Sequence, residues 1–258
     1  MKLISISLSL IIVTFMGCAS KSIDKKKAAD LKVELAISYI QEDNLPTALK
    51  ELLEAVDLDP SNPVVRNNLG IVYYMREKYE LAEKQFIEAV SLSPMFTEAK
   101  NNLARCQITL KKYNSALKLL KEAEADLTYT NSQYTYFNFG MLYFSQGKYE
   151  LAKSYFAKTL AADRTDCLSQ VYYSRSLLEL GHTQIAAQQL EKAIHFCSAQ
   201  NIDEAHYYSA IAYYRLNQKD KAMNRFEEVI KLFPNGKNSS NAGQMIKIIK
   251  NKNFQNRM

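Results

Sequence analysis

The chain has 258 residues, and its 33 lysines and arginines against 27 aspartates and glutamates give a formal net charge of +6 at pH 7. This charge is small and spread along the chain, so we do not expect nucleic acid as a partner. The length, the seven glycines and the five prolines fit a single elongated helical domain.

The first residues differ in character from the rest. A single Lys2 precedes an apolar run over 3–15 that is too short to span a bilayer stably, and Gly17 and Cys18 end it. We therefore predict a secretory signal over 1–17. A cysteine directly after a small residue resembles a bacterial lipobox. That resemblance implies that Cys18 becomes the new N-terminus and carries fatty-acyl chains such as palmitate.

The residue after the cysteine, Ala19, resembles the signal for transfer to the outer membrane. The expected location is therefore the periplasmic face of the outer membrane, with the protein held by lipid at Cys18. Residues 18–28 are expected to form the lipidated N-terminus and a polar linker. An ordinary secretory signal that happens to contain Cys18 is the alternative.

A pattern of small and bulky residues recurs six times between residues 29 and 236. From a small starting residue, an alanine follows at +12 and a bulky apolar residue at +16. The six starts and their alanines are Ala36 and Ala48, Gly70 and Ala82, Ala104 and Ala116, Gly140 and Ala152, Ser174 and Ala186, and Ala210 and Ala222. Small residues let two helices approach closely, so each copy predicts a hairpin of a helix A and a helix B. One hairpin cannot bury both faces, so the hairpins must stack.

This pattern resembles the tetratricopeptide repeat. The resemblance implies an all-α fold, a right-handed superhelix of six such hairpins with a capping helix after them. The expected units are 29–62, 63–96, 97–130, 133–166, 167–200 and 203–236, with the cap at 237–253. Thr128, Arg164 and Ser198 stand where a closing proline is usual, so looser joints are expected there. The spacing of the starts predicts longer turns after the third and fifth units.

The capping helix is expected to begin at Ser239 or Ser240, either of which can cap a helix N-terminus. Its apolar residues should cover the exposed side of the sixth hairpin; they are Met245, Ile246, Ile248 and Ile249.

The sequence contains little that could support catalysis. His182, His195 and His206 are 13 and 11 residues apart and share no helical face, and neither a glycine-rich phosphate loop nor a GxSxG motif is present. We therefore predict that the chain is not an enzyme and needs no cofactor, metal or small-molecule substrate.

Three cysteines lie within the repeats. Cys167 opens a helix A and Cys197 ends the following helix B, and antiparallel helices bring these two ends to the same side. A disulfide between them is one hypothesis, and two free thiols are the other. Cys106 lies among the small residues of a helix A and is expected in the core.

Binding is the function that remains. In repeats of this kind helix A lines the inner wall, so residues one step off its packing face should point into a protein-binding groove. The candidates are Ile37, Ile40, Asn67, Ile71, Tyr74, Met75, Asn101, Arg105, Ile108, Phe137 and Met141. The same wall includes Val33, Phe144, Arg175, Leu178 and Tyr207. Burial of these residues by the superhelix itself, or by self-association, is the alternative.

The repeats behind a lipobox resemble the PilF/PilW family of type IV pilus lipoproteins. The resemblance rests on ELAISYIQEDNLPTALKELLEAVDLDP (34–60), NNLGIVYYMREKYELAEKQFIEAVSLSP (67–94) and NNLARCQITLKKYNSALKLLKEA (101–123). It implies a pilotin that binds secretin subunits and assists their membrane insertion and multimerisation. Ala104, Arg105 and Cys106 depart from the family's pattern. The alternative is a periplasm-facing adaptor for cell-wall enzymes or for outer-membrane protein assembly.

Overall fold

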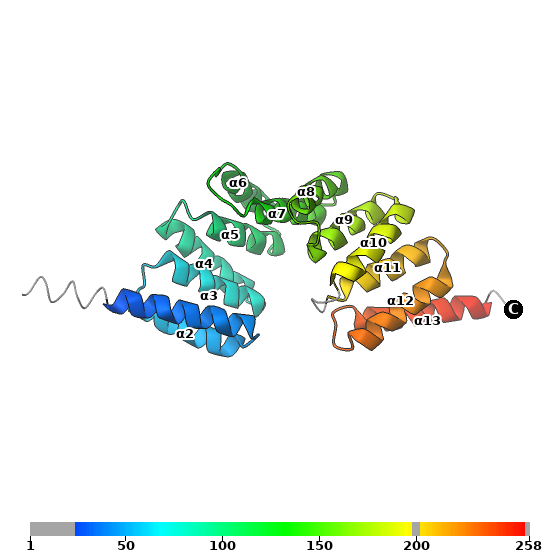
Figure 1. The fold of residues 1–258 in the computed structure, drawn as a ribbon, viewed down its shortest axis with the longest axis horizontal. Helices are drawn as coiled ribbons and strands as arrows, with labels where there is room; N and C mark the ends of the chain where they lie inside the picture. Colours follow the sequence, from blue (N-terminus) through cyan, green and yellow to red (C-terminus); the bar gives the residue numbers. More distant parts are fainter. Residues whose placement is uncertain (1–23, 198–201, 256–258) are drawn as a thin grey trace, which may run out of the picture. The chain divides into compact units, whose positions relative to one another are not determined.

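The computed structural model describes residues 24–197 and 202–255, and every regular element within them is a helix. The first helix covers residues 24–41. The others are α2 (Leu45–Leu58), α3 (Pro63–Met75), α4 (Tyr79–Leu92), α5 (Thr97–Thr109), α6 (Tyr113–Glu124), α7 (Ser132–Ser145), α8 (Tyr149–Ala162), α9 (Cys167–Glu179), α10 (Thr183–Cys197), α11 (Glu204–Arg215), α12 (Lys219–Leu232) and α13 (Ser239–Gln255). The expectation of an all-α fold of six hairpins with a final helix is confirmed (Figure 1).

The N-terminal segments fall partly outside this range. The predicted signal and Cys18 lie outside the described residues. Residues 24–28 were expected as linker, but they already belong to the first helix. Ala29 in the next turn is fully buried in the core that this helix forms with α2 and α3, so the helix is packed from near its start.

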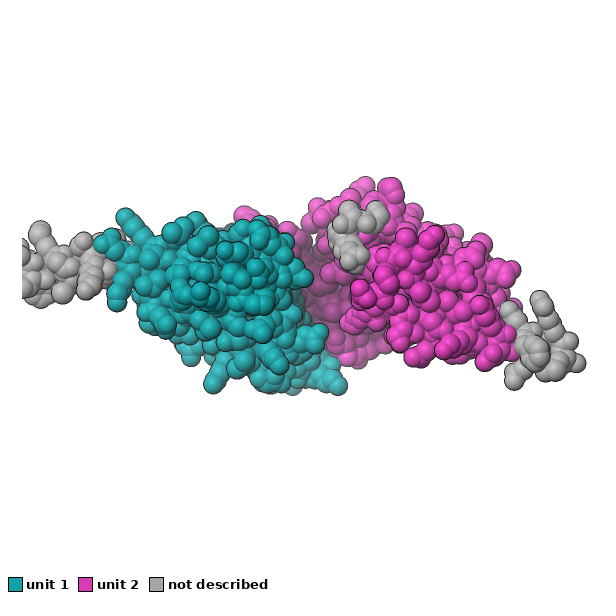
Figure 2. Space-filling model, turned by 90° about the horizontal axis from the view of Figure 1, so that it is seen from below, with its two compact units in different colours: residues 1–129 teal, residues 130–258 magenta. Residues whose placement is uncertain are grey.

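The chain divides into two compact units, residues 1–129 and 130–258 (Figure 2). In each unit, helices adjacent in sequence pack together, and so do the A helices α3 and α5 in the first unit and α9 and α11 in the second. Each unit therefore has the stacked arrangement that the repeating pattern requires.

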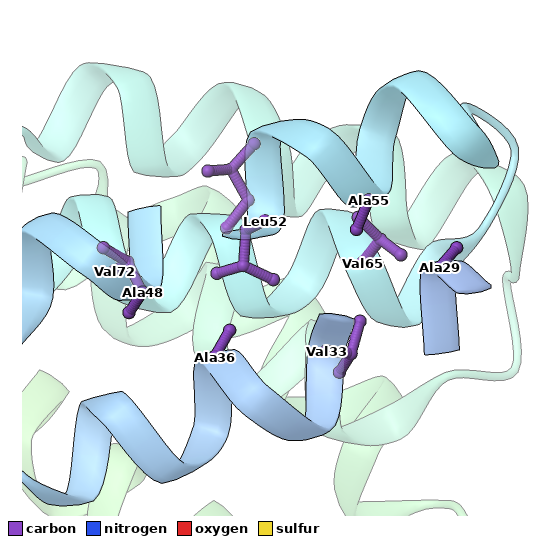
Figure 3. Packing of buried hydrophobic residues seen from close by; sticks show 9 residues of the cluster. Ala29, Val33, Ala36, Ala48, Leu52, Ala55, Val65 and Val72 are labelled. Atoms are coloured by element: carbon purple, nitrogen blue, oxygen red, sulfur yellow. The ribbon is translucent and has the colours of Figure 1, made fainter. Parts of the chain in front are cut away.

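The small residues of the pattern occupy the places where the two helices of each hairpin meet. All six alanines at the +12 position, Ala48, Ala82, Ala116, Ala152, Ala186 and Ala222, are fully buried. In the first hairpin, Ala36 and Val33 face residues of α2 and α3, as Figure 3 shows. Val33 was expected on the groove wall, but it belongs to this core.

Each turn from helix A to helix B contains one residue with positive φ. In the second hairpin this residue is Glu77 with φ 58°, and the chain places Asp43, Lys111, Gly147, Gly181 and Asn217 at the equivalent positions. The Glu77 amide donates to the Tyr74 carbonyl and the Lys78 amide donates to the Tyr73 carbonyl, both at 2.9 Å. This is the Schellman arrangement, which satisfies the last carbonyls of a helix and favours glycine at the left-handed residue.

We expect Glu77→Gly to raise the free energy of unfolding by about 1 kcal/mol, because a side chain in left-handed backbone costs that much and glycine does not. The matched control is Glu88→Gly, at an exposed position inside α4, where glycine should cost about 1 kcal/mol. Urea unfolding of the two variants measures both effects. Loss of stability in both would contradict the assignment of Glu77 to this conformation.

Two joints that lack a closing proline are held by aspartate side chains instead. Asp126 Oδ1 accepts hydrogen bonds from the Thr128 amide at 3.0 Å and hydroxyl at 2.6 Å, and Asp163 does the same for Thr165. These hydrogen bonds order the turns locally, and the expectation of looser joints between the repeats stays a prediction. The connection from α6 to α7 covers residues 125–131 and is longer than those at 59–62 and 93–96, as the spacing predicted. The fifth connection lies partly outside the described residues.

A disulfide closes the fifth hairpin. It joins Cys167, the first residue of α9, to Cys197, the last of α10, with the two Cα atoms 5.1 Å apart. The structure thus forms the bond that the sequence left as one of two possibilities. Cys106 is free and buried, and its Sγ donates to the Tyr79 carbonyl at 3.2 Å.

The final helix packs on α12 and covers the sixth hairpin in part as predicted. Ala242 and Ile249 are fully buried there, but Ile248 is 43% exposed and does not belong to this contact. Before the helix, the backbone amide and the side-chain amide of Asn238 donate to the two oxygens of Asp203, at 2.7 and 2.8 Å. These bonds attach the start of α13 to the start of α11.

Candidate protein-binding surface

The residues predicted to line a groove divide into those that reach the surface and those that do not. Ile37 and Met75 are each 40% exposed. A second group is partly exposed: Ile40, Ile71, Tyr74 and Arg105 in the first unit, and Phe137 and Met141 in the second. These eight residues remain candidates for contact with a partner.

The prediction is wrong for three residues. Asn67, Asn101 and Ile108 are buried, with at most 6% of their surface exposed, and do not line a groove. Leu178, on the same expected wall, is also buried. Helical periodicity gives the direction of a side chain, whereas the neighbouring helices decide how deeply it is covered.

Asn67 shows why an amide on this wall need not be a ligand. Its Oδ1 accepts from Asn102 Nδ2 at 3.0 Å, and its Nδ2 donates to Glu98 Oε1 at 3.4 Å. Asn68 uses its own amide within α3, donating to the Val64 carbonyl at 2.9 Å. Both asparagines are therefore structural, and Asn67 joins α3 to α5.

In the first unit, the exposed part of the wall contains an arginine stacked on a tyrosine. The Arg105 guanidinium carbon lies 4.4 Å from the centre of the Tyr74 ring. The Tyr74 hydroxyl is 3.0 Å from the Thr109 hydroxyl, and its ring meets that of Tyr79 edge-on at 5.2 Å. These contacts fix the ring under the guanidinium.

In the second unit, three aromatic rings surround an arginine. The Arg175 guanidinium carbon lies 4.8, 4.6 and 4.0 Å from the ring centres of Phe144, Tyr172 and Tyr208. Phe144 and Tyr172 also meet each other edge-on at 5.3 Å. Burial raises the pKa of the Tyr208 hydroxyl, and the positive charge of Arg175 opposes this rise. The hydroxyl is therefore protonated at neutral pH.

Sequence reasoning missed Tyr172 and Tyr208. Both stand two residues before the small start of their repeats, a position that Asn68, Asn102 and Asn138 occupy in the second to fourth repeats. The change from asparagine to tyrosine at this position is the signal that could have identified them.

Several side chains that could take part in chemistry have structural explanations. Burial raises the pKa of the Cys106 thiol to about 11, so the thiol stays protonated and unreactive near neutral pH. His206 Nδ1 lies 3.0 Å from Glu228 Oε2.

Among the described residues, the structure brings together no group of three or more histidine, cysteine or acidic side chains suited to a metal ion. No helix in the same part of the chain is long and apolar enough to cross a membrane.

Comparison with known families identifies the repeat. Models described as tetratricopeptide repeats match residues 38–76, 67–128, 134–166 and 204–236, together more than half of the chain. A sequence comparison with characterised proteins gives no significant match.

Solved structures share the fold at low sequence identity. PilF of Pseudomonas aeruginosa is 21% identical with a TM-score of 0.65, and the match covers 83% of this chain and 95% of that one. PilW, described as a widely conserved type IV pilus biogenesis factor, is 20% identical with a TM-score of 0.71, covering 81% and 95%. The Cut9–Hcn1 complex matches at 15% identity and a TM-score of 0.75, covering 88% of this chain and 44% of that one. The matched repeats and the buried small residues lead to one conclusion: the chain belongs to the tetratricopeptide repeat family.

Proposed function

We propose that this protein is a lipid-anchored scaffold of type IV pilus biogenesis, a pilotin that binds secretin subunits and assists their membrane insertion and multimerisation. The observation that carries the proposal is the extent of the structural match. The alignments include 95% of PilF and of PilW and more than four fifths of this chain. The lipobox-like sequence ending at Cys18 supports the same assignment.

The proposed anchor keeps the protein at the periplasmic face of the outer membrane. Acyl chains on Cys18 would each contribute about 0.8 kcal/mol for every buried CH₂ group, so two or three chains make release negligible. Attachment confines the repeats to a thin layer next to the membrane. The effective concentration near secretin subunits at the same membrane then rises without any additional contact.

The exposed helix A residues supply the proposed binding surface. Ile37 and Met75 offer apolar area in the first unit, and Phe137 and Met141 offer it in the second. Methionine and aromatic side chains adapt to different partners and suit an apolar or amphipathic segment. On this proposal the bound segment belongs to a secretin subunit that has not yet assembled, and holding it would prevent aggregation.

Deletion of the gene tests this function. We expect the heat-resistant secretin multimers to disappear from denaturing gels of membrane fractions, and reintroduction of the wild-type chain to restore them. Cys18→Ser should restore them poorly, because the chain cannot be acylated, and should shift the protein out of the membrane fraction. Cys106→Ser is the matched control, because this cysteine is buried in the repeats and is not part of the proposed lipid-attachment site. Unchanged multimers in the deletion strain would refute the secretin assignment.

A further inference from the structure

Two arginines on the proposed binding surface have no acidic partner. Other arginines do have hydrogen-bond acceptors: Arg215 donates to Glu179, Arg225 donates to Glu191 and Glu228, and Arg66 donates to the neutral acceptors Gln85 and the Pro60 carbonyl. In the described residues, the guanidinium groups of Arg105 and Arg175 form no hydrogen bond or ion pair and lie against aromatic rings.

Neither arginine is simply solvated on an exposed surface. Both side chains are partly buried, and the Nε of Arg105 is buried with no hydrogen-bond partner in the described chain. Glu179, one helical turn after Arg175, is not available to it because its carboxylate lies 3.0 Å from Arg215. A buried N–H without an acceptor, such as Nε of Arg105, has lost water without gaining an anion, which is unfavourable in an isolated protein.

The two arginines occupy equivalent positions. Each follows the small start of its repeat by one residue, and each stacks on the aromatic residue four places after the start of the preceding repeat, Tyr74 or Phe144. Arg175 follows Arg105 by 70 residues, and Phe144 follows Tyr74 by the same number. The segment between the ring and the arginine also repeats, because residues 78–82 and 148–152 are both KYELA. One arrangement is thus present twice, once in each unit.

The geometry defines what can bind. Aromatic rings lie against the guanidinium and hold it in place, whereas its planar edge carries the N–H donors and has no protein acceptor. A planar carboxylate matches that edge with two parallel hydrogen bonds. A single cation balances one negative charge, so a carboxylate fits better than a phosphate dianion.

We propose that Arg105 and Arg175 are each the receptor for a carboxylate of a bound protein segment, with an apolar or aromatic residue next to that carboxylate. The inference rests on the proposed protein-binding role of the helix A surface and specifies its ligand. Arg175, with three rings around it, forms the more apolar site and binds more tightly. The carboxylate comes from an acidic side chain or from a chain end, and the experiment separates these two sources.

The test uses the full-length protein in detergent micelles with ¹⁵N-labelled arginine, in which each arginine gives its own Nε–Hε signal. The first probe is N-acetyl-Phe-Glu-amide, the second is N-acetyl-Phe-Gln with a free carboxyl terminus, and the control is N-acetyl-Phe-Gln-amide. We expect the signals of Arg105 and Arg175 to shift with at least one acid, and the amide control to bind at least tenfold more weakly. Shifts with the first probe alone assign side-chain carboxylates, and shifts with the second alone assign a chain end.

Variants check that the response comes from these sites. R175K retains the charge but cannot form two parallel bonds, so it should weaken binding of the effective acid at least fivefold while the Arg105 signal still responds. R76K, at the exposed end of α3, is the matched control and should bind as the wild type does. Equal binding of acids and amide, or shifts no larger at Arg105 and Arg175 than at the paired Arg66 and Arg225, would overturn the proposal. None of these readouts depends on secretin, so the proposal can survive failure of the pilus assignment.

Discussion

Replacing Cys167 and Cys197 together with alanine is expected to lower the free energy of unfolding by about 3–4 kcal/mol. The bond links residues 30 positions apart, and cross-linking a loop of that length restricts the unfolded chain. The loss should be concentrated in the fifth hairpin, because stacked repeats contact only their neighbours. Amide hydrogen exchange should therefore accelerate most in α9 and α10 and remain unchanged in α3 and α4.

Reduction of the wild-type protein separates the bond from the side chains. A reductant should reproduce most of the effect in the wild type and have no effect on the double variant. Cys106→Ala is the matched control, because it alters a buried free cysteine without opening a closed loop. If alkylation without reductant labels both Cys167 and Cys197, the bond is absent from the protein and the prediction fails.

The pattern of small residues was sufficient to predict the hairpins because their burial follows from local rules. An alanine at +12 meets the small residue of helix A wherever two helices pack closely, so Ala82 and Ala152 could be placed in the core without knowledge of the remaining chain. The Schellman turns are similarly local. Gly147 and Gly181 stand at two of them, and Glu77 and Lys111 occupy the same place in their repeats, seven residues after the small start.

The binding surface was predicted less well because it depends on neighbouring repeats. Asn67 and Ile71 are four residues apart on one helix, yet Asn67 is buried by a hydrogen bond to the next A helix and Ile71 is partly exposed. The cluster around Arg175 combines residues from three repeats, so no single repeat reveals it. Aligning the repeats with one another would have shown the tyrosines at 172 and 208.

Gly70→Ala is expected to lower the free energy of unfolding by about 1–3 kcal/mol, because the added methyl group overpacks the second hairpin. A Cβ at this position would lie 2.6 Å from Cε1 and 2.7 Å from Cδ1 of Phe86, whose ring is fully buried. Either the Phe86 ring must shift within the core or the α3 and α4 helices must separate. Alanine's better helix propensity, about 1 kcal/mol, offsets part of this cost.

The control for that propensity is Gly243→Ala in α13, where the new Cβ would meet only Ile230 Cδ1 at 3.9 Å. This variant should gain about 0.5–1 kcal/mol. Gly140→Ala should behave as Gly70→Ala does, because its Cβ would lie 2.5 Å from the Phe156 ring. Unfolding of the three variants in urea gives the comparison.

A second substitution tests whether the ring is the cause. The first and third hairpins pair an alanine start with leucine at +16, as in Ala36 with Leu52 and Ala104 with Leu120, and all four residues are fully buried. Phe86→Leu should therefore rescue Gly70→Ala, and the double variant should be more stable than the sum of the single effects by at least about 1 kcal/mol. In the sixth hairpin Ala210 and Phe226 are both fully buried, so two helices can pack at a distance that accommodates an alanine and a phenylalanine. The stability lost in Gly70→Ala therefore measures how strongly α3 and α4 resist moving to that distance. Strictly additive effects would mean that Gly70 is required by something other than the Phe86 ring.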